Sequence, residues 1–190
     1  MALADRRLTS ARSAVDEEFQ KLVAFSSPTA RLAVAFAGLA TAPGMLMNFV
    51  LPECLIEAAK DGPQPEDVVD GVARRLEASF HSLPSSVTDA DRQTAVLFAG
   101  YKYETNGRQE IFVRSVANYR RGATETHPFR VDAIPDSERY NYMTAVGASH
   151  ALVDSDMEAL GDLINGLKPP HAVLGKAVEV VRAAARSTAA

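Results

Sequence analysis

The chain has 190 residues, a length that predicts a single domain over residues 1–190 with a sizeable hydrophobic core. Its hydrophobic fraction of 47% and charged fraction of 23% are those of a folded globular protein and exclude a largely disordered chain. With 20 Lys and Arg against 24 Asp and Glu, the formal net charge is −4, which argues against a nucleic-acid partner because phosphate binding needs a basic surface.

Cysteine content and one apolar stretch bear on where the protein resides. Cys54 is the only cysteine, so no internal disulfide can form, which predicts a reducing, cytoplasmic environment and a thiol that belongs to the core. The uncharged stretch 32–52 is long enough to cross a bilayer, but Gly38 and a Pro43-Gly44 pair interrupt it. We therefore interpret it as a buried strand, a turn and the start of a helix, and expect no membrane association.

The first half of the chain predicts a hairpin and two helices. Two apolar runs, 21–25 and 31–37, flank a Ser-Ser-Pro-Thr turn and predict paired strands. A helix is predicted over 44–60, and a second begins near Pro65, followed by a polar loop over 84–91. The apolar residues of this second helix recur at helical spacing and predict a buried stripe of Val68, Val69, Val72, Leu76, Phe80 and Leu83.

The second half predicts another hairpin and two more helices. Strand-like runs at 94–101 and 111–116 flank Asn106-Gly107, a dipeptide that favours hairpin turns, and 142–146 is a further candidate strand. One helix is predicted over 148–165, with a break near Asp154, and a last helix follows a Lys-Pro-Pro sequence. Because strands and helices come in separate runs, the pattern predicts an α+β fold rather than an alternating βαβ fold.

Several short patterns carry a family resemblance. Residues 4–9 read Ala-Asp-Arg-Arg-Leu-Thr, and Lys21 follows Asp5 by sixteen positions at the start of a predicted strand. The next predicted strand ends in Ala37-Gly38. The Gly100-Tyr101 strand, the Asn106-Gly107 hairpin, the Val146-Gly147 strand end and an alanine-rich last helix follow in order. Together these features, which span almost the whole chain, resemble the proteasome β-subunit family of N-terminal-nucleophile (Ntn) hydrolases, in which the Ala-Asp-x-Arg-x-Thr motif, the lysine and the Ala-Gly pair follow one another in the same way.

The resemblance implies a four-layer αββα sandwich and hydrolysis of a peptide or amide substrate by an N-terminal threonine, whose α-amine is the base. It also implies roles for individual residues. Lys21 would activate the nucleophile, Asp5 would orient Lys21, Arg7 would support that pair, and the Gly38 backbone N–H would donate to the oxyanion. No metal or cofactor is implied, and assembly into a ring-type homo-oligomer is expected.

The sequence departs from the family pattern at three places. The family's nucleophile begins a strand upstream of the aspartate motif, but this chain starts at Met1, so we expect that first strand and its threonine to be missing from it. Ala2 has no nucleophilic atom. Ala148 stands where the family has a serine, with Ser149 displaced by one position, and no aspartate follows the last predicted helix.

Three interpretations therefore remain open at this point. The protein is a threonine-type peptidase or amidohydrolase that begins upstream of Met1, a non-catalytic subunit that acts through homo-oligomeric assembly, or an unrelated α+β domain. Structural roles are also open: Lys21 can be a surface lysine at a strand edge, Asp5 and Arg7 can form a surface ion pair, and Gly38 can serve a turn. A basic group of four arginines can bind an anion or form a solvated face: Arg114, Arg120, Arg121 and Arg130.

Overall fold

The computed structural model describes residues 8–10, 13–16, 20–120, 125–133, 154–166 and 168–187. The chain divides into two compact units, one formed by residues 1–20 and 135–190 and the other by residues 21–134, and each is described by itself. Its described elements comprise five helices and nine strands, so the predicted α+β class is confirmed.

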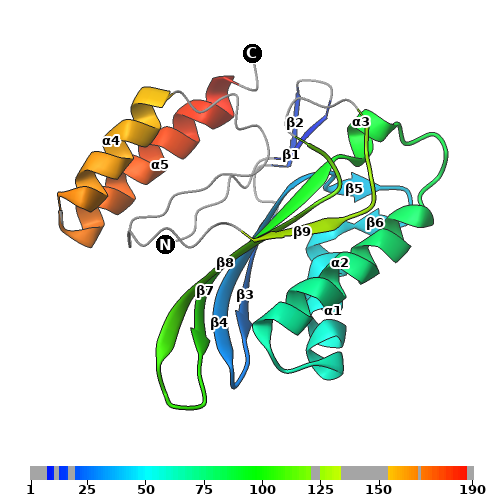
Figure 1. Ribbon diagram of the computed structural model, residues 1–190. Helices are drawn as coiled ribbons and strands as arrows, with labels where there is room; N and C mark the ends of the chain where they lie inside the picture. Colours follow the sequence, from blue (N-terminus) through cyan, green and yellow to red (C-terminus); the bar gives the residue numbers. More distant parts are fainter. Residues whose placement is uncertain are drawn as a thin grey trace. The chain divides into compact units, whose positions relative to one another are not determined.

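The larger unit is built on a five-stranded antiparallel sheet with the order β3-β4-β7-β8-β9 (Figure 1). The two predicted hairpins are confirmed as the pairs β3–β4 and β7–β8, and the turn of the second places Gly107 at a φ of 78°, where glycine is favoured. Strand β9 lies in an arginine-containing stretch for which no element was predicted. The strands are β3 (Leu22–Ser26), β4 (Ala30–Gly38), β7 (Thr94–Tyr103), β8 (Gln109–Ala117) and β9 (Arg130–Ala133).

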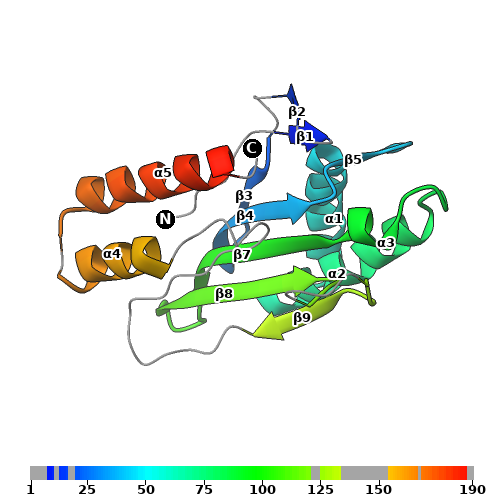
Figure 2. The ribbon, with the colours of Figure 1, turned by 90° about the horizontal axis from the view of Figure 1, so that it is seen from above.

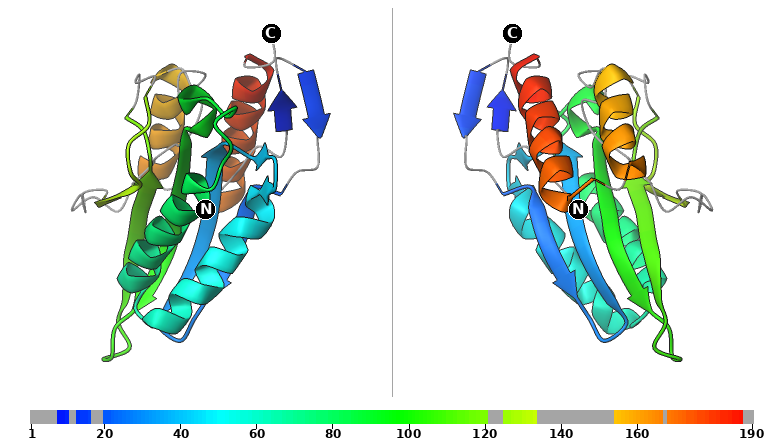
Figure 3. Two further views of the ribbon diagram at one scale, coloured as in Figure 1. Left: turned by 90° about the vertical axis from the view of Figure 1, so that its right-hand side faces the viewer. Right: turned by 90° about the vertical axis from the view of Figure 1, so that its left-hand side faces the viewer.

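Helices α1 (Met47–Asp61) and α2 (Pro65–His81) lie on one face of this sheet (Figure 3). Helix α2 begins with proline at its first position and acidic residues in its first turn, which suit the helix N-terminus. Its predicted stripe is confirmed, since each of the six side chains is at most 8% exposed. The core between helices and sheet is apolar and includes Val34, Phe98, Phe112, Val116, Leu51, Leu55, Val68, Val72 and Leu76.

Two boundaries in this unit differ from the prediction. Helix α1 begins at Met47 rather than at residue 44, because a tight hairpin formed by β5 (Thr41–Ala42) and β6 (Met45–Leu46) precedes it. The predicted polar loop 84–91 contains the start of a short helix, α3 (Asp89–Arg92), which Thr88 caps by accepting the Asp91 N–H at 3.3 Å.

The apolar stretch 32–52 forms parts of β4 and α1, separated by the small hairpin, as its interruptions predicted. Among the helices that the structure describes, none is both long enough and apolar enough to cross a membrane.

The smaller unit contains a strand pair and a helix pair. Strands β1 (Leu8–Ser10) and β2 (Ser13–Asp16) are antiparallel and were not predicted. Helices α4 (Asp154–Asn165) and α5 (Pro170–Ser187) lie side by side (Figure 2) and share a small apolar cluster of Leu160, Val173, Ala177 and Val180. The predicted strand 142–146 and the first residues of the helix predicted over 148–165 lie outside the described residues.

Candidate functional site

Two of the predicted catalytic residues lie at the same end of the larger sheet. The Phe36 N–H donates to the Lys21 carbonyl oxygen at 3.1 Å, so Lys21 lies beside Phe36 just before β3 begins. Gly38 is two residues further along, at the end of β4. The structure therefore brings Lys21 and Gly38 to one end of the β3–β4 pair. Asp5 and Arg7 lie outside the described residues, and their contact with Lys21 stays a prediction.

Gly38 has a backbone that requires glycine. Its φ is 102°, a conformation that other residues rarely adopt. A Cβ atom at this position would lie 1.9 Å from the Gln93 carbonyl oxygen, so the end of β4 and the start of β7 approach more closely than any side chain allows. The residue itself is exposed. The backbone conformation at Gly38 is therefore fixed by steric contacts, and the residue is also accessible from outside the unit.

The direction of the Gly38 N–H follows from its neighbours. Along a strand, successive N–H groups point alternately to the two adjacent strands. The Phe36 N–H points toward β3, where it bonds to Lys21, and the Leu39 N–H points toward β7, where it bonds to the Gln93 carbonyl at 3.2 Å. This alternation places the Gly38 N–H on the β3 side of β4, the same side as Lys21.

A buried polar pair lies next to Gly38. Thr94 is 0% exposed and Asn118 is 4% exposed, and among the residues whose burial the structure describes they are the two buried polar ones. Asn118 Oδ1 accepts the Thr94 N–H at 2.7 Å, and its Nδ2 donates to the Arg92 carbonyl at 2.9 Å. Thr94 Oγ1 in turn lies 3.2 Å from the Leu39 nitrogen, which donates to it. No sequence motif pointed to either residue, and a Thr or Asn at a strand end is by itself a weak signal.

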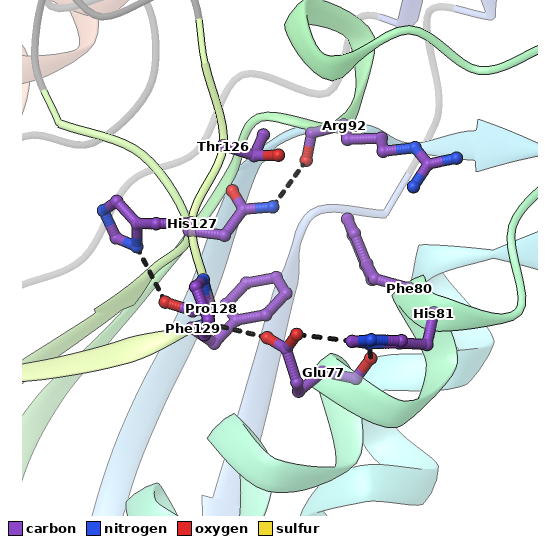
Figure 4. A pocket seen from close by; sticks show the side chains of 9 residues that line it. Glu77, Phe80, His81, Arg92, Thr126, His127, Pro128 and Phe129 are labelled. Atoms are coloured by element: carbon purple, nitrogen blue, oxygen red, sulfur yellow. Dashed lines mark hydrogen bonds and ion pairs between the residues drawn. The ribbon is translucent and has the colours of Figure 1, made fainter. Parts of the chain in front are cut away.

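A pocket of about 280 Å³ lies beside this pair (Figure 4), lined by Glu77, Phe80, His81, Arg92, Asn118, Thr126, His127, Pro128 and Phe129. Its polar groups are largely used in holding the chain together. Glu77 accepts the Phe129 N–H at 2.8 Å and contacts His81 at 3.2 Å, and the Phe80 and Phe129 rings meet edge to face at 5.0 Å. The Arg92 guanidinium donates to the loop carbonyls of Leu83, Pro84 and Val87. The contacts among the residues that line the pocket therefore serve mainly to hold residues 125–129 against α2.

The other candidate side chains, Cys54 and Arg114, make contacts that stabilise the fold. Cys54 is buried in α1, where burial, helped by nearby Glu53, raises the pKa of its thiol to about 11, so it is a core residue as predicted. The Arg114 guanidinium lies over the Phe112 ring, 5.0 Å from its centroid, and Arg121 lies outside the described residues. Within the part of the chain that is described, no group of three or more His, Cys, Asp or Glu side chains could hold a metal ion.

No protein-family model matches this chain, and neither curated proteins nor solved structures include one similar enough to count as a match. The resemblance to the proteasome β-subunit family therefore rests on the short motifs and their order, and it enters the functional argument as a proposal.

Proposed function

We propose that this protein is an Ntn hydrolase of the proteasome-like type, a threonine-type peptidase or amidohydrolase. The observation that carries the proposal is the placement of Lys21 and Gly38 at one end of the sheet, with the Gly38 N–H on the side of Lys21. Lys21 supplies an ammonium group and Gly38 a backbone N–H, and these are the two kinds of donor that an amide hydrolase needs, one for its nucleophile and one for the oxyanion.

The fold supports the same proposal. Its order of a hairpin, two helices, a second hairpin and two terminal helices is the order expected for a four-layer αββα sandwich. In that arrangement α1 and α2 form one outer layer and the five-stranded sheet lies beneath them. The sheet face opposite to these helices carries Ala33, Leu97, Ala99 and Val113, which are only partly exposed, and such an apolar face suits packing against a further layer.

The proposed reaction begins with an N-terminal threonine, whose hydroxyl oxygen attacks the carbonyl carbon of the amide while its own α-amine takes the proton. The Lys21 ammonium favours the deprotonated hydroxyl, and Asp5, supported by Arg7, holds that ammonium in place. The Gly38 N–H donates to the oxygen that becomes negatively charged. The α-amine then protonates the leaving amine, and water hydrolyses the acyl-enzyme. These steps use no metal or cofactor.

A second candidate is a non-catalytic proteasome-like subunit that acts through homo-oligomeric assembly. It is favoured by large apolar side chains that are exposed just before and along α1. Leu46 is 45% exposed, Phe49 68% and Ile56 58%, and exposed apolar surface of this kind is used in contacts between proteins. Ring-type assembly is compatible with both candidates, so only catalysis separates them.

The direct test compares Lys21→Ala with Lys60→Ala in the protein purified from its native host, with hydrolysis of fluorogenic peptide amides as the readout. Loss of the activating ammonium should lower the rate by about 100-fold or more. Lys60 is a matched control, because its side chain is 64% exposed and pairs with Glu57 on the surface of α1. Unchanged hydrolysis after Lys21→Ala would remove Lys21 from the mechanism. An inactive but oligomeric unsubstituted protein would favour the second candidate.

A further inference from the structure

We infer that Thr94 and Asn118 are positioning residues for the backbone at Gly38. The inference rests on the proposed function, in which the Gly38 N–H stabilises the oxyanion. Neither residue belongs to the family motifs, and each acts through backbone groups rather than through the substrate. Two observations support this role. Thr94 and Asn118 are the two buried polar residues among those whose burial is described, and both form hydrogen bonds at the strand ends that meet at Gly38.

Thr94 acts directly on the peptide that follows Gly38. The Leu39 nitrogen lies 3.2 Å from both the Gln93 carbonyl oxygen and Thr94 Oγ1, so its hydrogen is shared between acceptors on two consecutive residues at the start of β7. The peptide plane between Gly38 and Leu39 is therefore held from the β7 side. Because Phe36 is held from the β3 side by the Lys21 carbonyl, the backbone on both sides of Gly38 is anchored.

Asn118 in turn holds Thr94, and all four of its polar groups are bonded. Its side chain joins the Thr94 N–H to the Arg92 carbonyl, as described above, which also determines which end of the amide is oxygen. Its backbone N–H donates to the Thr94 carbonyl at 3.2 Å, and its carbonyl accepts the His127 N–H at 2.7 Å. Asn118 thus links the start of β7, the end of β8 and the segment that lines the pocket.

The burial of Thr94 and Asn118 makes their hydrogen bonds effective in fixing the backbone. With 0% and 4% exposure, Thr94 and Asn118 have little contact with solvent water that would compete for their hydrogen bonds. Buried neutral hydrogen bonds are directional and leave little freedom to the groups that they join. An oxyanion donor works when it is already aimed before the charge develops, and support behind it provides that aim.

The experiment replaces only the Thr94 hydroxyl, because truncation of Asn118 disturbs more of the fold. Thr94→Val keeps the shape and removes the acceptor, while Thr94→Ser keeps the acceptor. Thr29→Val is the matched control, since the Thr29 hydroxyl donates to the Pro63 carbonyl at the opposite end of the sheet. The readouts are kcat and KM for peptide amide hydrolysis by the protein from its native host, and the hydrogen-exchange rate of the Leu39 amide.

We expect Thr94→Val to lower kcat by about tenfold or more with KM changed less than about twofold, and to speed exchange at Leu39 by about tenfold. Thr94→Ser should restore both, and Thr29→Val should change neither. An unchanged kcat in Thr94→Val, or an unchanged Leu39 exchange rate, would overturn the inference and leave the proposed function standing. Absence of hydrolysis in the unsubstituted protein would overturn the proposed function and this inference with it.

Discussion

The two ends of the five-stranded sheet are held together by different chemistry. At the Gly38 end, Thr94 and Asn118 form a buried network of neutral hydrogen bonds. At the other end, Lys102 on β7 is 27% exposed and forms three ion pairs, at 3.2 Å to Glu110 and at 3.4 Å to both Glu66 and Glu104. The same strands run through both ends, so the difference lies in the side chains.

This difference shows which end of the sheet has a prescribed geometry. Neutral hydrogen bonds weaken as distance and direction depart from their optimum, whereas the attraction between partly solvated charges changes less over the same displacement. The Lys102 end can therefore hold the hairpin β7–β8 in several side-chain arrangements. The Gly38 end specifies one backbone conformation, which is what an oxyanion donor requires.

The largest expected effect is that of Gly38→Ala. An alanine Cβ would lie 1.9 Å from the Gln93 carbonyl oxygen, and alanine would also have to adopt a φ of 102°. The steric overlap and the backbone strain would both destabilise the folded state. We expect the free energy of unfolding to fall by about 3–5 kcal/mol, measured by urea denaturation. Gly107→Ala is the control, because its φ of 78° is also positive but no atom lies within 4 Å of the new Cβ. Its cost should be about 1 kcal/mol, and equal costs would show that the Gly38 end is not tightly packed.

Asn118→Ala should have the next largest effect. It removes two side-chain hydrogen bonds and leaves the buried Thr94 N–H and the part-buried Arg92 carbonyl without these partners. We expect a loss of about 2–4 kcal/mol in the free energy of unfolding. Asn106→Ala provides the comparison, since Asn106 is exposed and accepts one backbone N–H, from Arg108. That variant should lose less than about 1 kcal/mol, and a similar loss in both would contradict the importance of burial.

Lys102→Met should cost only about 1 kcal/mol, because its ion pairs are partly solvated. Burial by itself lowers the pKa of Lys102, but Glu110, Glu66 and Glu104 more than offset it, and the pKa is raised from 10.5. The stability that Lys102 contributes is therefore complete below pH 10.5 and is lost as the pH rises through the higher pKa of the folded state. The difference in the free energy of unfolding between the unsubstituted protein and Lys102→Met should therefore shrink above pH 10.5, as measured by urea denaturation. A difference that grows above this pH would contradict a stabilising role of the Lys102 ammonium.

The smallest effect, and the sharpest contrast between the two ends, is the response to salt. In about 0.5 M sodium chloride the Debye length falls well below its low-salt value, so the cost of Lys102→Met should drop by roughly half. The cost of Asn118→Ala should stay the same, because neutral buried bonds are not screened. Urea denaturation of both variants at low and high salt measures this contrast. Equal salt sensitivity would mean that the two ends are not held by different chemistry.

Strong local patterns made part of the larger unit predictable from sequence. The Asn106-Gly107 turn and the apolar spacing in α2 each depend on neighbouring residues only, and both predictions are confirmed. Strand β9 was missed because its pairing with β8 is set by a partner distant in sequence. The roles of Thr94 and Asn118 were missed for the same reason, since their 24-residue separation along the chain is closed only by the sheet. Lys21 and Gly38 were predicted from the resemblance of several ordered motifs to those of a family, and their common position at one end of the sheet follows only from the structure.

The most direct test of the proposed hydrolase is the identity of the mature N-terminus, determined by N-terminal sequencing and intact mass of protein purified from its native host. The proposal expects a chain that begins with threonine, or with serine or cysteine as the equivalent nucleophile, ahead of Ala2. A mature chain that begins at Met1 or Ala2 would contradict the catalytic proposal and leave assembly as the function to pursue.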